Sequence, residues 1–487
     1  MRALAVIAVV TAAAMTVLAA RDDPRVAFLM GSRSARTSMP LSYRIPASFW
    51  AAVGSAPNDP EQTAERIIAS FGLNIYDGAC FQIAMALGGQ AELARAQTLR
   101  LLSGMSGDID ILGGAPSFSY GNGKWTGAHP YFMRTITDSF IQMDPLTGKA
   151  IDWMDWKPIT GENAWACLIG PLQSLYISRG RSLSAMRYDD PEVRLAVTRL
   201  AVFKAMQSPL GALYYAANGT PGVNDFTEVS VENNVSMLAG LRLLRQVLQA
   251  ACDPDQLIPL VDDISNGILQ FLRDGAYDAN DGVFIQGGVI VAGRLLPSPD
   301  FAVDVQTWGL TVLGQAQVDE WLGQGAAARI WQRTKARAGA LAADGRLQGV
   351  GYTDGHVIVS GEWTYGAINM CRTLAAQYKA LGQDQVAAEL SADAESMIAG
   401  LEQLRTSVPD GTVAVLYANQ RYRIPFSGGW WANPVPSTAS TAWSLMIDMR
   451  VNPFEFGAQA PDDVPLDPTG TRVLLPEAPA GAPVAQA

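Results

Sequence analysis

Histidine is almost absent from this chain, and cysteine and basic residues are scarce. The 487 residues include two histidines, His129 and His356, and four cysteines with no Cys-x-x-Cys pair among them. Protein zinc sites draw most of their ligands from these two residue types, and four cysteines in so long a chain do not make a disulfide framework. The net charge of −11 provides no surplus of Lys and Arg for phosphate binding. We therefore expect no metal, no other cofactor and no nucleic-acid partner.

Several sequence motifs and one kind of segment are missing as well. The chain has no P-loop, no Gly-x-Gly-x-x-Gly after a strand and no Gly-x-Ser-x-Gly elbow, which argues against nucleotide, Rossmann and serine-hydrolase functions. After residue 20, no apolar run reaches the roughly 18 residues that a membrane span needs. Residues 1–20 combine an early Arg, an apolar stretch and small residues, which predicts a secretory signal cleaved near Ala19 or Ala20. We expect an exported periplasmic or extracellular protein that leaves the membrane after cleavage; an uncleaved anchor is the alternative.

A recurring pattern is what the chain does contain. At six places, about 60 to 85 residues apart, an acidic or polar residue precedes a tightly apolar helical run. The six residues are Asp77, Glu162, Glu232, Asp304, Glu362 and Ser440. The runs that follow are apolar nearly all round, as in helices buried on every side, whereas segments such as 257–272 and 386–404 are apolar on one face only. This alternation predicts six helical hairpins whose inner helices begin on one common face.

The hairpins divide the chain into four parts. Residues 1–20 are the predicted signal, and 21–57 are expected to be an irregular lead-in. Residues 58–456 are expected to form one ring of hairpins, with a first outer helix over 59–70 and short strands at 283–291 and 413–417. Residues 457–487 are rich in Pro and Ala, which predicts a partly disordered tail.

The starts of the inner helices carry the motifs YDGA, GENAW, ENN and GEWTYGA. With six such starts over residues 60–456, the chain resembles the (α/α)6-toroid carbohydrate-active enzymes, which include inverting glycoside hydrolases and some polysaccharide lyases. Endo-β-glucanases of this fold are the nearest comparison. The resemblance implies an all-α (α/α)6 toroid with long loops and a carbohydrate substrate, and we expect a monomer.

The recurring acids are the candidate catalytic residues. Inverting hydrolysis needs a carboxylic acid and a carboxylate about 6.5–9.5 Å apart, a separation that acids facing each other across a narrow ring can meet. We predict Glu162 and Glu362 in these two roles, in either order, with Glu232 and Asp304 as further catalytic candidates. Helix capping is the alternative for each. Because a helix N-terminus favours the ionised form, the acid must be desolvated, and Trp165 and Trp363 are expected to do this.

Tryptophan is the second sign of a sugar ligand, because indole rings stack on pyranose rings and donate hydrogen bonds to hydroxyls. Nine of the twelve tryptophans lie in loops before the inner helices or at their starts. We predict substrate-binding roles for Trp125, Trp153, Trp156, Trp165, Trp308, Trp363, Trp430 and Trp431, and also for Asp77, His129, Asn233 and Tyr365. For Trp165, Trp308 and Trp443, core packing is the alternative.

Two other functions stay open at this stage. A toroid lyase would take a proton with His129 or Tyr131 and neutralise a uronate with Arg134 or Asn233. A glycan-binding protein of the same fold would need no opposed carboxylates. The preferred interpretation is an exported glycoside hydrolase that inverts the anomeric centre of a neutral or weakly charged polysaccharide.

Overall fold

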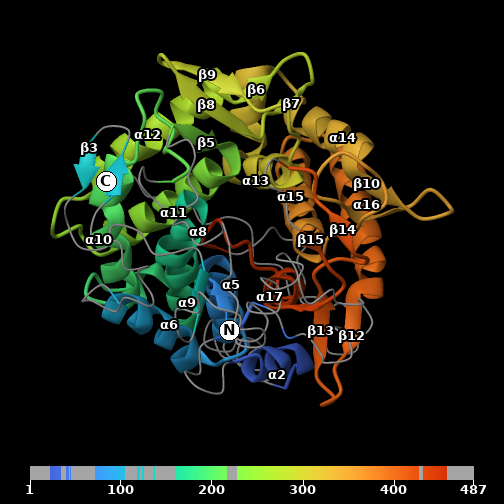
Figure 1. Ribbon diagram of the computed structural model, residues 1–487, viewed down its shortest axis with the longest axis horizontal. Coiled ribbons are helices and arrows are strands. Elements are labelled where there is room, and N and C mark those ends of the chain that lie inside the picture. Colours follow the sequence, from blue (N-terminus) through green and yellow to red (C-terminus); the bar gives the residue numbers. More distant parts are fainter. Residues whose placement is uncertain are drawn as a thin grey trace, which may run out of the picture.

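The chain folds into a double ring of helices, seen end-on in Figure 1. The computed structural model describes residues 22–33, 40–42, 44, 72–104, 118–120, 123–125, 135–137, 159–216, 227–426 and 431–457. The inner helices are α5 (Ile75–Leu87), α8 (Thr160–Ala164) with its continuation α9 (Gly170–Ser178), α11 (Val231–Ala250), α13 (Val303–Leu322), α15 (Gly361–Ala380) and α17 (Thr438–Asp448). Each packs against the next, and α17 packs against α5, which closes the ring. The predicted (α/α)6 toroid and its six inner-helix starts are confirmed.

The outer helices each follow an inner helix and pack against it. They are α6 (Ala91–Gly104), α10 (Pro191–Ala205), α12 (Ile258–Gly275), α14 (Ala326–Ala338) and α16 (Asp384–Leu401). Helix α12 buries Val261, Ile264 and Ile268 and exposes its opposite face. Helix α5, in contrast, buries almost every residue. These burial patterns match the predicted difference between two-faced outer helices and inner helices that are apolar all round.

The last inner helix, α17, is covered by the opposite end of the chain. Helix α2 (Pro24–Gly31) packs against α17 and α5 and occupies the sixth outer position. It lies within 21–57, which the sequence predicted to be irregular. The helix forms because Asp23 caps it, Pro24 begins it, and Val26, Phe28 and Leu29 are fully buried. The predicted outer helix over 59–70, the signal over 1–20 and the tail after 457 lie outside the described residues.

Arg25 holds this closing helix in place, which gives a first testable prediction. Its guanidinium is bound to Asp448 at 2.5 Å, to Ser444 at 3.1 Å and to Asp23 at 2.7 Å. Because Arg25 is buried, we expect Arg25→Ala to lower the free energy of unfolding by about 2 kcal/mol in urea denaturation. Arg33→Ala is the control, since Arg33 donates to Met30 O within the same segment, and should cost about 1 kcal/mol or less. Equal losses in the two variants would contradict a closing role for Arg25.

Short antiparallel strands lie along the loops, and β1, β5 and β16 run directly into inner helices. The two-stranded pairs are β1 (Gly72–Asn74) with β4 (Thr135–Thr137), β2 (Phe118–Tyr120) with β3 (Gly123–Trp125), β6 (Tyr277–Asp278) with β7 (Val283–Phe284), β10 (Gly339–Leu341) with β11 (Leu347–Val350), and β14 (Tyr422–Arg423) with β15 (Trp431–Ala432). The three-stranded sheets are β5 (Glu228–Ser230), β8 (Gly287–Val291) and β9 (Arg294–Pro297), and β12 (Arg405–Ser407), β13 (Val413–Leu416) and β16 (Pro436–Ser437). Strands β7, β8 and β13 confirm the strands predicted at 283–291 and 413–417.

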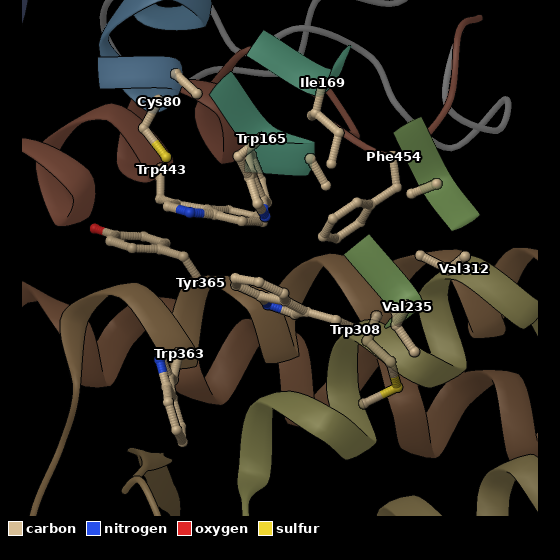
Figure 2. Packing of buried hydrophobic residues seen from close by; sticks show 14 of the residues in the cluster. Cys80, Trp165, Ile169, Val235, Trp308, Val312, Trp363, Tyr365, Trp443 and Phe454 are labelled. Carbon is tan, nitrogen blue, oxygen red and sulfur yellow. The ribbon is translucent and has the colours of Figure 1, made fainter. Parts of the chain in front are cut away.

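An aromatic cluster fills the axis of the inner ring (Figure 2). The loop after α17 inserts Phe454 from the end where that helix finishes, so that its ring centroid lies 5.4, 5.6 and 6.2 Å from those of Trp165, Trp308 and Trp443. Gln173 fixes the loop, because its Nε2 donates to three of the backbone carbonyls in 452–455. The ring is thereby closed at this end. Among the described helices, none is both long and apolar enough to cross a membrane.

Candidate active site

Five of the six inner helices present a carboxylate in their first turn. These are Asp77 on α5, Glu162 on α8, Glu232 on α11, Asp304 on α13 and Glu362 on α15. The capping positions belong to other residues: Asn74, Ser230, Ser360 and Ser437 cap four of the helices through their side chains, and α8 and α13 have no side-chain cap. Helix capping therefore does not account for Asp77, Glu232 and Glu362, whereas Asp304 accepts from a first-turn N–H of its own helix.

Glu362 is a buried acid with a strongly raised pKa. Its side chain is buried, and burial raises its pKa to about 8. A hydrogen bond from Tyr76 lowers this pKa, and the nearby charges of Asp77, Glu232 and Glu162 raise it. The helix dipole favours the ionised form by only about 0.3–1 kcal/mol, so burial and like charge prevail. At neutral pH Glu362 is mostly a neutral carboxylic acid, able to donate a proton.

The order of helices in the ring decides which acids lie across from each other. Helices α8 and α15 are separated by two inner helices in both directions around the ring, as are α5 and α13 (Figure 1). Glu162 and Glu362 therefore start from opposite sides of the ring, and Asp77 and Asp304 form a second opposed pair. The catalytic roles of Glu162 and Glu362 stay predictions.

Asp304 has a mixed environment. Burial raises its pKa to about 7, the backbone N–H of Val305 donates to its Oδ1 at 2.8 Å and lowers the pKa, and the charge of Glu362 raises it. The pKa of Asp304 therefore lies near neutrality and is sensitive to the charge of Glu362.

Glu232 is held by side-chain donors on both oxygens. The amide Nδ2 of Asn233 donates to Oε2 at 2.8 Å, and the Ser236 hydroxyl donates to Oε1 at 2.6 Å. The indole N–H of Trp165 in turn donates to Ser236 Oγ at 3.1 Å. Both oxygens of Glu232 thus accept hydrogen bonds from side chains within the protein, so the environments of Glu232 and Glu362 differ.

The aromatic cluster forms an apolar floor under the carboxylates. Trp165, Trp308 and Trp443 are all at most 4% exposed. The indole of Trp308 fits against Gly366, where an added Cβ would lie 2.6 Å from its Nε1. Tyr76 was not among the predicted site residues. Its hydroxyl accepts from Trp443 Nε1 at 2.7 Å and is hydrogen-bonded to Glu362, so Tyr76 connects the aromatic cluster to the acids. The packing alternative thus holds for these three tryptophans, whose indoles build the bottom of the site.

Three residues predicted to bind substrate have other roles in the structure. Trp363 packs edge-to-face on Tyr352, with ring centroids 4.8 Å apart, and points away from the other indoles (Figure 2). Tyr365 is buried, and its hydroxyl lies toward Arg25 and Asp448 at the far end of α17. Trp363 points away because neighbouring helical positions are about 100° apart, which places it on another face of α15 than Glu362.

Asn233 is the third of these residues. Its Oδ1 accepts from the backbone N–H of Gly161 at 2.5 Å, and its Nδ2 donates to Glu232 and to Ser230 Oγ. These bonds use the acceptor and both donor directions of the amide within the protein. Asn233 therefore organises the site rather than reaching toward a ligand, which also removes it from the lyase alternative.

The remaining predicted residues lie on the loops. Trp431 is half-buried, and the guanidinium of Arg421 lies 4.2 Å from its ring centroid, covering one face. His129, Trp153, Trp156 and Trp430, and Tyr131 and Arg134 of the lyase alternative, lie outside the described residues, as does the side chain of Trp125. Their proposed roles stay predictions. Within the described ranges, no group of three His, Cys, Asp or Glu side chains is placed to hold a metal ion.

A cavity of about 690 Å³ lies elsewhere, between α12 and the β6 and β9 segments on the outer side of the ring. It is lined by Asp274, Tyr277 and Arg294 among others. Asp274 is paired with Arg273, which holds the pKa of Asp274 below its usual range. An acid of lowered pKa is a poor proton donor, so the cavity lacks the chemistry found at the inner-helix ends.

Comparison with known proteins gives resemblances at low identity. A solved glycosidase variant is 13% identical with a TM-score of 0.49, over 90% of this chain and 97% of that one. A D-mannose isomerase is 10% identical with a TM-score of 0.49, over 90% and 96%. A GH76 α-mannanase from Bacteroides thetaiotaomicron is 10% identical with a TM-score of 0.43, over 83% and 98%. No protein-family profile and no curated protein matches the sequence.

Proposed function

We propose that this protein is a glycoside hydrolase that inverts the anomeric centre of its substrate. The observation that carries the proposal is a buried acid with a pKa of about 8, Glu362, set across the ring from Glu162 above an indole floor. Two carboxyl groups with different protonation states on opposite sides of a site are what the inverting reaction requires.

The chemistry assigns one role to each acid. Glu362 donates its proton to the glycosidic oxygen as the bond from that oxygen to the anomeric carbon breaks. Glu162 accepts a proton from a water molecule whose oxygen bonds to the anomeric carbon from the opposite face, which inverts the configuration. Asp77, Glu232 and Asp304 accept hydrogen bonds from sugar hydroxyls. After one turnover Glu162 returns its proton to solvent and Glu362 regains one.

The substrate class follows from charge. The negative charges of Asp77, Glu162 and Glu232, gathered in one ring, repel a polyanion, and the net charge of −11 acts in the same direction. We therefore propose a neutral or weakly charged polysaccharide or oligosaccharide. Export, predicted from the signal at residues 1–20, agrees with a polymeric substrate that lies outside the cell.

The test is an activity screen of the mature protein on a panel of polysaccharides, with reducing ends and ultraviolet absorbance recorded together. New reducing ends without absorbance, and an initial product of inverted configuration by NMR, are the expected result. An equal gain in absorbance means an unsaturated product and replaces hydrolysis by β-elimination. Binding without turnover on the panel, measured by calorimetry, supports a glycan-binding protein instead.

The pH dependence of kcat/KM offers a second prediction. Glu362 acts in its protonated form, so the rate should fall as pH rises through about 8, the pKa of that group in the free enzyme. The other limb should fall at acidic pH, where the base becomes protonated. A profile still rising above pH 9 would contradict an acid role for Glu362.

A further inference from the structure

One side chain, Asn233, joins the N-terminal ends of two neighbouring inner helices. Its Oδ1 accepts from the backbone N–H of Gly161 on α8 at 2.5 Å, and its Nδ2 donates to Glu232 Oε2 on α11 at 2.8 Å. Gly161 directly precedes Glu162 in the chain. The amide therefore lies between the carboxyl group of Glu232 and the backbone that carries Glu162.

The fit at this junction is tight. A Cβ added to Gly161 would lie 2.7 Å from Asn233 Oδ1, so the close approach of the two helices depends on glycine there. The second oxygen of Glu232 is tied to the same neighbouring helix, through Ser236 to the indole of Trp165. Trp165 begins a π-helical turn, Trp165–Ile169, directly after α8. Glu232 is thus fastened to α8 at both oxygens.

The chemistry of the junction selects an amide. The backbone N–H of Gly161 requires an acceptor, and the Glu232 carboxylate requires a donor. Asparagine carries both on one planar group, and Asn233, at 5% exposed, has no room to exchange them. Aspartate would still accept from Gly161 but would place a second carboxylate against Glu232. Two carboxylates in contact cannot both ionise without a large cost.

We propose that Asn233 is a positioning residue that holds and orients the carboxyl group of Glu232 while it fixes the first turn of α8 for Glu162. The link between Glu232 and α8 through Asn233 does not depend on the reaction, although its effect on the rate rests on the proposed function. The other first-turn acids at this end of the ring are Asp77 on α5, Glu162 on α8, Asp304 on α13 and Glu362 on α15.

The first test uses stability, which needs no substrate. In Asn233→Asp the carboxyl pair binds a proton more tightly in the folded than in the unfolded protein, so its stability, relative to the parent, falls as pH rises from 5 to 8. Glu232→Gln in the same chain restores a donor opposite the new acceptor. We expect the melting temperature of Asn233→Asp to drop more at pH 8 than at pH 5, and the double variant to recover most of that loss.

Asn234→Asp is the matched control. Asn234 is the next residue, is fully buried, and bonds to Leu213 and to the backbone of Ser230 instead of to Glu232. Glu232→Gln should not rescue it. Rescue confined to position 233 supports the proposal, and equal rescue at both positions or at neither overturns it. Should Asn233→Asp alone leave the protein unfolded at every pH tested, a folded Asn233→Asp, Glu232→Gln double variant counts as rescue, and an unfolded double variant overturns the proposal.

Activity separates the two proposals. If the protein hydrolyses a glycan, the acidic limb of kcat/KM should move to higher pH in Asn233→Asp and stay in place in Asn234→Asp, a shift that a purely structural role does not produce. If Glu232→Gln restores stability but the protein is inactive on the whole panel, the positioning role of Asn233 is supported and the glycoside hydrolase function is rejected. If the protein hydrolyses a glycan but Glu232→Gln does not restore stability, the hydrolase function is supported and the positioning role of Asn233 is rejected.

Discussion

Replacing Glu362 by Gln is expected to lower kcat by about 10²–10⁴-fold on a natural glycan, the usual contribution of a general acid. The amide keeps the shape of the carboxyl group but cannot donate the proton that the leaving oxygen needs. Substrates with an activated leaving group need little protonation, so they should recover much of the rate in Glu362→Gln but not in Glu162→Gln. Equal losses on both kinds of substrate would contradict the assignment of Glu362 as the acid.

A second measurement on Glu362→Gln needs no substrate. The pKa of Glu362 is raised in the folded protein, to about 8, so its ionisation costs stability as pH rises from the ordinary value toward 8. Removing the acid should therefore raise the melting temperature of the variant above that of the parent at pH 8, and by less at pH 5. Glu395→Gln, on the exposed face of α16, is the control and should change neither rate nor melting temperature.

Truncating Phe454 is expected to give the largest loss of stability. Phe454→Ala removes a buried ring that contacts all three axial indoles, and such changes cost about 3–5 kcal/mol. The cavity would open at the closed end of the ring, below the acids. Chemical denaturation gives the loss directly.

Phe456, two residues further on, offers a matched control. It is half-buried and packs on Tyr176 with ring centroids 4.6 Å apart, at the edge of the structure. Phe456→Ala should cost clearly less, about 1–2 kcal/mol. If the two truncations cost the same, the axial cluster is not the centre of the core that its contacts indicate.

The helix starts could be predicted because their signals are local. Each inner run is apolar on all sides, and a polar or acidic residue marks its beginning, so periodicity over some fifteen residues is sufficient. The first-turn acids were found for the same reason. Tyr76 lies directly before Asp77 within the YDGA motif, yet its role depends on Trp443 at the other end of the chain, which no local pattern shows.

The roles of the tryptophans were harder to predict. Trp165 and Trp363 occupy similar places at inner-helix starts, yet Figure 2 shows Trp165 beside the other indoles and Trp363 pointing away from them. Trp363 packs on Tyr352 instead. A shift of one position turns a helical side chain by about 100°, so a small uncertainty in the helix phase reverses the prediction. Asn233 was predicted to bind substrate. Its actual role could not be predicted, because its partner, the backbone of Gly161, is distant in the chain.

The sequence by itself determined the number of inner helices, the common face on which they begin and the identity of the acids there, because helical periodicity and first-turn residues are short-range properties. The tertiary structure decided which acids lie opposite each other, which one burial keeps protonated, how α2 completes the outer ring, and how Phe454 closes one end of its axis. Those properties depend on desolvation and on contacts between residues hundreds of positions apart, and only the closed ring brings such residues together.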